Sequence, residues 1–126
     1  MKDRFIRLAT QQAYQSTMPN RLGAVVVNKK TVLGAGYNRR DHPLLYTGKV
    51  PILHPNMGMH AEIAALYYID YKSLNDSILY VVRLRRNHSI ALSKPCSSCQ
   101  WYIKTSGIKR VIYSLDDGSF KQMRIT

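Results

Sequence analysis

Residues 78–84, Ile-Leu-Tyr-Val-Val-Arg-Leu, form a dense apolar run near the middle of the 126-residue chain. The run is short and rich in β-branched and aromatic residues, which predicts a strand rather than a helix. Almost every position is apolar, so we expect this strand to be buried on both faces. A strand of this kind requires covering layers on each side of its sheet.

Three helices are expected around this strand. Apolar residues at near-helical spacing predict the first helix over residues 3–16 and the second over residues 60–71. The third is expected over residues 96–106, with Gly107 at the position just past its end, where glycine is favoured.

The remaining strands form two predicted hairpins. Residues 23–27 and 31–37 are joined by three residues, so we expect an antiparallel pair. Residues 110–115 and 120–125 are joined by the turn Asp116-Asp117-Gly118-Ser119, which is too short for a crossover helix. The sequence therefore predicts an α/β fold in a single domain, residues 1–126. Its architecture is a three-layer α-β-α sandwich with a five-stranded mixed sheet, and its last two strands form an antiparallel hairpin.

The charge is strongly positive, with 19 Lys and Arg residues against 7 Asp and Glu and a formal net charge of +12. Such an excess favours an anionic partner, either a nucleotide or a nucleic acid, although a solvated surface explains it equally well. No apolar run reaches membrane-spanning length, so no membrane partner is expected. The first nine residues do not read as a signal peptide. With only two cysteines, we expect a cytoplasmic protein.

Two short blocks carry the chemistry: His60-Ala61-Glu62 and Pro95-Cys96-Ser97-Ser98-Cys99. One imidazole and two thiols make three zinc ligands, and catalytic zinc sites typically use three protein ligands and a water. Cys96 and Cys99 are three residues apart, so both should lie on one face of the first helical turn. His60 would be the third ligand, and Glu62 would act as a general acid and base.

Two other interpretations compete with a catalytic zinc site. The Cys-x-x-Cys spacing also occurs in redox pairs, although the accompanying His-x-Glu block argues against that role. A structural zinc site would need a fourth ligand, for which His54 is the first candidate and His42 the second.

The two blocks together resemble the zinc-dependent cytidine/deoxycytidylate deaminase superfamily, a signature known for nucleobase deaminases. The resemblance covers nearly the whole chain, including the order of elements. It implies that His60, Cys96 and Cys99 hold Zn²⁺ and that Glu62 is the proton shuttle. It further implies that the backbone N–H of Ala61 meets the base. Asn38 matches an asparagine that contacts base or sugar, although it could be a turn residue alone.

Further residues are candidates for substrate contacts. Arg83 and Arg85 are expected near the carboxyl end of the central strand, where one of them could meet a substrate phosphate or simply be solvated. Ser93 and Lys94, just before Pro95, are further expected contacts. Trp101 could stack on a base, but core packing is favoured for it.

The function that we predict is hydrolytic deamination of a cytosine-type base in cytidine, deoxycytidine or their monophosphates. Histidine as the first ligand resembles the deoxycytidylate, tRNA adenosine and editing branches, whereas the direct final hairpin resembles free cytidine deaminases and toxin deaminases. Deamination of cytosine or adenine in single-stranded DNA or RNA is therefore an alternative. A non-catalytic zinc domain that binds nucleic acid is a further one. Relatives of this kind commonly self-associate, so a homo-oligomer is expected.

Overall fold

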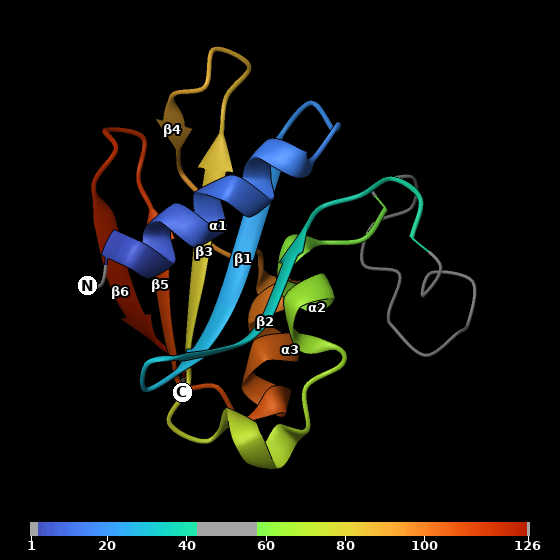
Figure 1. Ribbon diagram of the computed structural model, residues 1–126, viewed down its shortest axis with the longest axis vertical. Helices are drawn as coiled ribbons and strands as arrows, with labels where there is room; N and C mark the ends of the chain where they lie inside the picture. The colour runs from blue at the N-terminus through green and yellow to red at the C-terminus, as the bar shows by residue number, and fades with distance from the viewer. Residues whose placement is uncertain (1–2, 43–57, 126) are drawn as a thin grey trace.

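The computed structural model describes residues 3–42 and 58–125. The elements in chain order are α1 (Asp3–Gln15), β1 (Arg21–Asn28), β2 (Thr31–Tyr37), α2 (Ala61–Leu66), a 3₁₀ helix (Tyr71–Leu74), β3 (Ile78–Leu84), β4 (Ile90–Ala91), α3 (Ser97–Ser106), β5 (Arg110–Ser114) and β6 (Phe120–Arg124) (Figure 1). The predicted order of helices and strands is confirmed. The two-residue strand β4 and the 3₁₀ helix were not predicted.

One mixed sheet organises the chain, with its main strands in the order β2-β1-β3-β5-β6. β1 runs antiparallel to both β2 and β3, and β3 runs parallel to β5. β6 runs antiparallel to β5, so both predicted hairpins are confirmed. The added strand β4 pairs with the end of β3, Arg83 with Ala91 and Leu84 with Ile90. β3 thus changes partner on one side, from β5 to β4, near its carboxyl end.

Helices cover both faces of this sheet, which confirms the three layers. Residues of β1 and β3 alternate between two core clusters, as the two-residue period of a strand requires. One cluster packs against α1 and contains Phe5, Ala9, Val25, Val27, Tyr80, Val82 and Ile112. The other packs against α2 and α3 and contains Ala24, Val26, Ala61, Ala65, Leu66, Leu79, Val81, Ile103 and Val111. Figure 1 shows α1 crossing in front of β1 and β3.

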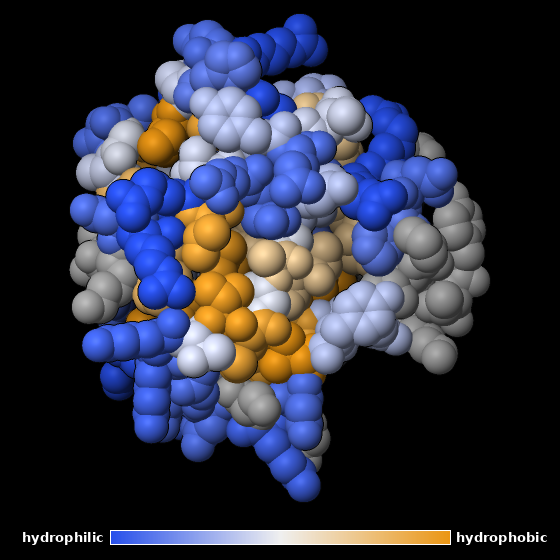
Figure 2. Space-filling model, viewed as in Figure 1, coloured by the Kyte–Doolittle hydropathy of each residue, from blue (hydrophilic) through white to orange (hydrophobic). Residues whose placement is uncertain are grey.

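Hydrophilic residues surround the margin of the face shown in Figure 2. Figure 2 shows an apolar area below α1 in this view, over the part of the sheet that α1 leaves uncovered. Within residues 3–42 and 58–125, no helix combines the length and apolar character needed to cross a bilayer.

The helix predicted over residues 60–71 is shorter than expected. α2 ends at Leu66, and the backbone of Asp70 is extended, with φ −61° and ψ 123°. The Asp70 carboxylate accepts a hydrogen bond of 3.1 Å from the backbone N–H of Lys72 and so caps the 3₁₀ helix that follows. The helical spacing includes Asp70, but short acidic side chains favour caps over helix interiors.

Two glycines in β2 let α2 approach the sheet closely. A Cβ atom at Gly36 would lie 2.7 Å from the Ala64 Cβ and 2.8 Å from the Ala65 backbone nitrogen. A Cβ atom at Gly34 would collide with the Ala65 carbonyl oxygen. The absence of side chains at Gly34 and Gly36 thus lets α2 pack closely against β2 at Ala64 and Ala65.

Candidate zinc and catalytic site

His60 and Glu62 stand at the start of α2. His60 is the residue before the first turn, with an extended backbone (φ −76°, ψ 148°), and it is partly buried. Glu62 lies within the first turn and is only 5% exposed. The change from extended to helical backbone allows both side chains to face the same volume although they are two residues apart. This arrangement agrees with the prediction from sequence.

Cys96 and Cys99 stand at the start of α3, directly after Pro95. Cys96 precedes the first turn, and its Sγ accepts a hydrogen bond of 3.4 Å from the backbone N–H of Cys99. Cys99 is buried, whereas Cys96 is exposed. Both thiols therefore lie at the amino end of the helix, where free N–H groups and the helix dipole stabilise thiolates. At the other end Gly107 has φ 96°, which confirms the predicted helix stop.

The three predicted ligands converge. One donor atom each from His60, Cys96 and Cys99 lies within 4.8 Å of the others, and His60 Nδ1 is 3.1 Å from Cys99 Sγ. Imidazole nitrogen and thiolate sulfur are the donors that zinc prefers. Within the described part of the chain, no fourth His, Cys, Asp or Glu joins this group, so His42 does not complete a structural site. His54 lies outside the described residues.

The electrostatics of the group suit a cation. Burial raises the pKa of the Cys99 thiol far above its ordinary value, and the neighbouring Glu62 and Cys96 raise it further. Burial also raises the pKa of Glu62, although a backbone hydrogen bond and one with Cys99 oppose this change. A divalent metal would favour the ionised form of each of these acids, because opposite charge offsets the cost of burying negative charge. The donor set therefore fits zinc.

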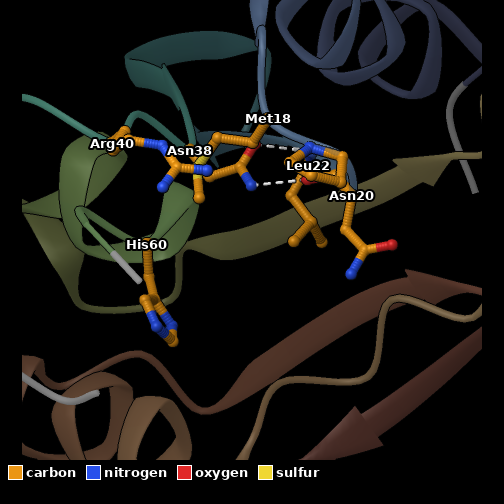
Figure 3. Close-up of a pocket in the computed structure, with 7 residues that line it drawn as sticks. Met18, Asn20, Leu22, Asn38, Arg40 and His60 are labelled. Carbon is orange, nitrogen blue, oxygen red and sulfur yellow. Dashed lines mark hydrogen bonds between the residues drawn. The ribbon is translucent and has the colours of Figure 1, made fainter. Parts of the chain in front are cut away.

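Two adjoining cavities open beside these residues, and they share Asn20, Leu22 and His60. The cavity of about 190 Å³ is lined by Asn20, Leu22, His60, Glu62, Arg83, Leu92, Ser93, Lys94 and Cys96. The cavity of about 290 Å³ is lined by Met18, Pro19, Asn20, Leu22, Asn38, Arg40 and His60 (Figure 3). We call the first the catalytic cavity and the second the outer cavity.

The predicted substrate contacts divide between these places. Arg83, Ser93 and Lys94 line the catalytic cavity together with Glu62, as a shared site requires. Ala61 lies between His60 and Glu62, with its side chain fully buried in the core.

Arg85 does not line either cavity. Its guanidinium donates to the Ile90 carbonyl at 2.6 Å and pairs with Asp116 at 2.9 Å, so it fastens the β3–β4 turn. Of these two arginines, Arg83 alone lines a cavity beside the predicted zinc ligands.

Asn38 serves the framework and the cavity wall at once. Its Oδ1 accepts a hydrogen bond of 2.8 Å from the Leu22 backbone N–H, and its Nδ2 donates to the Asn20 carbonyl at 2.6 Å. Figure 3 shows these bonds on one side of the outer cavity, with His60 on the opposite side. Asn38 thereby ties the start of β1 to the end of β2 and fixes the segment that lines both cavities.

Sequence reasoning is wrong about Trp101 and misses part of the cavity wall. The sequence favours core packing for Trp101, but its side chain is 65% exposed, because α3 directs its buried positions, Cys99 and Ile103, to the opposite side.

The connection from α1 to β1, residues 18–20, is recognisable in the sequence only as the end of a helix. Its role depends on the pairing of Leu22 with Arg83 across β1 and β3, which no local pattern reveals.

Comparisons with known proteins agree with this geometry. The family described as "Cytidine and deoxycytidylate deaminase zinc-binding region" matches residues 1–115. A deoxycytidylate deaminase from Mycobacterium phage D29 is 33% identical over 86% of this chain and 90% of its own length. One from Saccharomyces cerevisiae is 29% identical over 95% of this chain, which spans 40% of that relative.

Two solved structures share the fold. A cytidine deaminase from Burkholderia pseudomallei superposes with a TM-score of 0.67 at 16% identity, over 99% of this chain and 93% of that one. The apo dCMP deaminase from the cyanophage S-TIM5 gives a TM-score of 0.59 at 24% identity, over 92% and 86% of the two chains.

Proposed function

Since this chain belongs to the cytidine and deoxycytidylate deaminase family, we propose that it deaminates the cytosine ring of a free mononucleotide, with Glu62 as the proton shuttle. The single observation that carries this proposal is the catalytic cavity. One small space brings together two of the three predicted zinc ligands, His60 and Cys96, with a buried carboxylate that is not a ligand and two cations, Arg83 and Lys94.

The chemistry divides between metal and carboxylate. A bound zinc ion lowers the pKa of a coordinated water to about 7 and so supplies the nucleophile. Glu62 would take one proton from the attacking water on a carboxylate oxygen and deliver it to the ring nitrogen. It would then take the second proton of that water and deliver it to the departing amine. The reaction consumes one water and releases ammonia, so the carboxylate ends in its starting form. Glu62 suits this role because it lines the same cavity as the predicted zinc ligands His60 and Cys96.

The hydrogen-bonding capacity that Arg83 leaves unused supports a nucleotide as the substrate. Arg83 Nη2 donates to Asn20 Oδ1 at 2.8 Å, whereas its Nη1 reaches the Leu92 carbonyl only at 3.5 Å. Its Nε is buried and has no hydrogen-bond partner among the described residues. Its two Nη groups carry more N–H donors than these two bonds use, and phosphate is one of the groups that a guanidinium binds well. The names of the two relatives also point to deoxycytidylate.

An ammonia-release screen tests the proposal. Cytidine, deoxycytidine and their monophosphates are compared with guanine, adenosine, single-stranded DNA and tRNA. We expect deoxycytidine monophosphate to be turned over fastest. Glu62→Gln should reduce kcat by about 10²- to 10⁴-fold, the usual contribution of a general acid and base. Zinc content should stay at that of the unaltered protein, because Glu62 is not a ligand. Full turnover by the Glu62→Gln variant would contradict the shuttle, and turnover of purines alone would contradict the substrate.

The rival substrate is a polynucleotide, which the net charge of +12 favours. A flipped or single-stranded base could enter the same cavity. Binding of a single-stranded oligonucleotide should then weaken steeply between low and moderate salt, because many phosphate contacts release counterions. We expect a shallow salt dependence and no release of ammonia from the oligonucleotide. Self-association of the chain and a cytoplasmic location stay predictions from sequence.

A further inference from the structure

The exposed ligand Cys96 is held by its neighbours along the chain and not by burial. Packing cannot fix it, because its side chain is open to solvent whereas Cys99 is buried. The segment before it, Ser93–Pro95, is buried at Ser93 and Pro95 and exposed at Lys94. Whatever fixes this segment therefore sets the position of Cys96 and one wall of the catalytic cavity.

Two buried hydroxyls tie the start of this segment to the sheet. Ser93 Oγ donates to the Val81 carbonyl at 2.7 Å and accepts from the Ser114 backbone N–H at 2.7 Å. Ser114 Oγ donates to the Ala91 carbonyl at 2.6 Å, and the two hydroxyl oxygens are 2.8 Å apart. Ser93 and Ser114 are 3% and 0% exposed.

These hydroxyls sit where β3 changes partner from β5 to β4. Backbone groups at such a junction lose their regular ladder partners, and an unpaired buried group is costly. The two serines satisfy four of them: the Val81 and Ala91 carbonyls and the Arg83 and Ser114 N–H groups. A backbone bond of 2.9 Å from Ser93 N–H to the Ser114 carbonyl completes the junction. The Ser93 hydroxyl is thus hydrogen-bonded to backbone groups of β3 and β5.

A second anchor holds the other end of the segment. The Gln100 side chain, in the first turns of α3, donates to the Pro95 carbonyl at 2.8 Å. The chain between the two anchors is short, and it ends at Cys96. We define Ser93, Ser114 and Gln100 as the bracket of the cysteine segment.

We propose that this bracket positions Cys96 for the metal, so that Ser93, Ser114 and Gln100 act as positioning residues for the zinc site. Groups that orient metal ligands from outside the ligand set typically change metal affinity by about 10- to 100-fold when removed. The proposal requires that His60, Cys96 and Cys99 hold the metal, and it does not depend on which substrate is deaminated.

The test measures metal binding directly. Zinc dissociation constants are determined by chelator competition for the full chain and for Ser93→Ala, Ser114→Ala and the double variant. We expect each single variant to raise the constant about 10- to 100-fold. The double variant should add little, because both hydroxyls belong to one network. Co²⁺ substitution gives a second readout, because its visible spectrum reports the geometry of the ligands. The Co²⁺ spectra of Ser93→Ala and Ser114→Ala should differ from that of the unaltered protein.

Matched controls separate positioning from general loss of stability. Ser77→Ala removes another serine that is 1% exposed, at the opposite end of β3, and should leave both metal readouts unchanged. Gln100→Ala keeps the core intact and should weaken zinc binding about fivefold, the loss of one neutral hydrogen bond. Gln12→Ala, which removes a glutamine from α1, is its control and should leave zinc binding unchanged. If Ser114→Ala does not fold, Ser93→Ala and Gln100→Ala decide the question.

The proposal is overturned if the folded bracket variants bind zinc within twofold of the unaltered protein, or if Ser77→Ala weakens binding equally. Failure of the unaltered protein to bind Zn²⁺ or Co²⁺ would instead refute the ligand set itself.

Discussion

Arg83 is the residue whose replacement should separate a nucleotide deaminase from a nucleoside deaminase. We would change it to Met, which keeps a flexible unbranched side chain and removes the guanidinium and its charge. Its present bonds are modest: one good contact to Asn20 at 2.8 Å and one long contact to Leu92 at 3.5 Å. The fold should therefore tolerate the change, since Asn20 is exposed and can bond to water instead.

The magnitude follows from the donors that Arg83 has to spare. A hydrogen bond to a charged group contributes about 1.5–3 kcal/mol. At about 1.4 kcal/mol per tenfold change, this corresponds to a loss of about 10- to 150-fold. The loss should appear in kcat/KM for deoxycytidine monophosphate and should be absent for deoxycytidine, which has no phosphate. The assay is ammonia release from both substrates at low salt, where the charge is least screened.

Arg85→Met is the matched control. It removes the same charge from the same end of β3, but Arg85 lies outside both cavities and its exposed pair with Asp116 contributes little. The ratio of the two kcat/KM values should therefore change by less than about twofold. An equal loss on both substrates in Arg83→Met would refute the phosphate contact, because it would indicate damage to the catalytic cavity and not to phosphate recognition.

Other predictions test the fold and the metal. Removing zinc with a chelator should abolish turnover and lower the Tm, because a ligand present at 100 times its Kd stabilises the native state by about 2.7 kcal/mol; added Zn²⁺ should restore both, and an unchanged Tm would mean that no metal had been bound. Gly36→Ala should destabilise the protein by about 1–3 kcal/mol in urea unfolding, because the new methyl group meets α2. Ala35→Ser, at the exposed neighbouring position, is its control. Trp101→Ala should change the free energy of unfolding by less than about 0.5 kcal/mol; a loss of several kcal/mol would show that the indole is packed.

The order of helices and strands was accessible from sequence because each element has its own period and its own end. The run over residues 78–84 could only be a strand with covered faces, and β1 and β3 indeed serve both core clusters. The Asp116–Ser119 turn is too short for the crossover that parallel strands need, so the antiparallel pairing of β5 and β6 was predictable. β4 was not predicted, because two residues are too few to show a period. The predicted end of α2 was wrong, because Asp70 caps the following 3₁₀ helix and does not continue α2.

The ligand set was likewise local information. Cys96 and Cys99 lie on one helical turn, and His60 and Glu62 lie at one helix start, so residue type and spacing already define what each pair can bind. Part of the cavity wall was not local. Residues 18–20 and Leu22 reach the site only through the pairing of Leu22 with Arg83, and Arg40 reaches it only where the end of β2 passes His60.

The sequence by itself therefore determined the two residue blocks that could supply a metal site, because helix geometry fixes the relative positions of side chains a few residues apart. The tertiary structure alone decided which of the two arginines lines the catalytic cavity. Arg83 and Arg85 are two residues apart near the end of one strand, and the chemistry of their side chains is the same. β4 and Asp116 engage Arg85 at the turn, whereas Arg83 lines the cavity beside Glu62. That difference depends on contacts between segments distant in sequence, and only the folded chain brings those segments together.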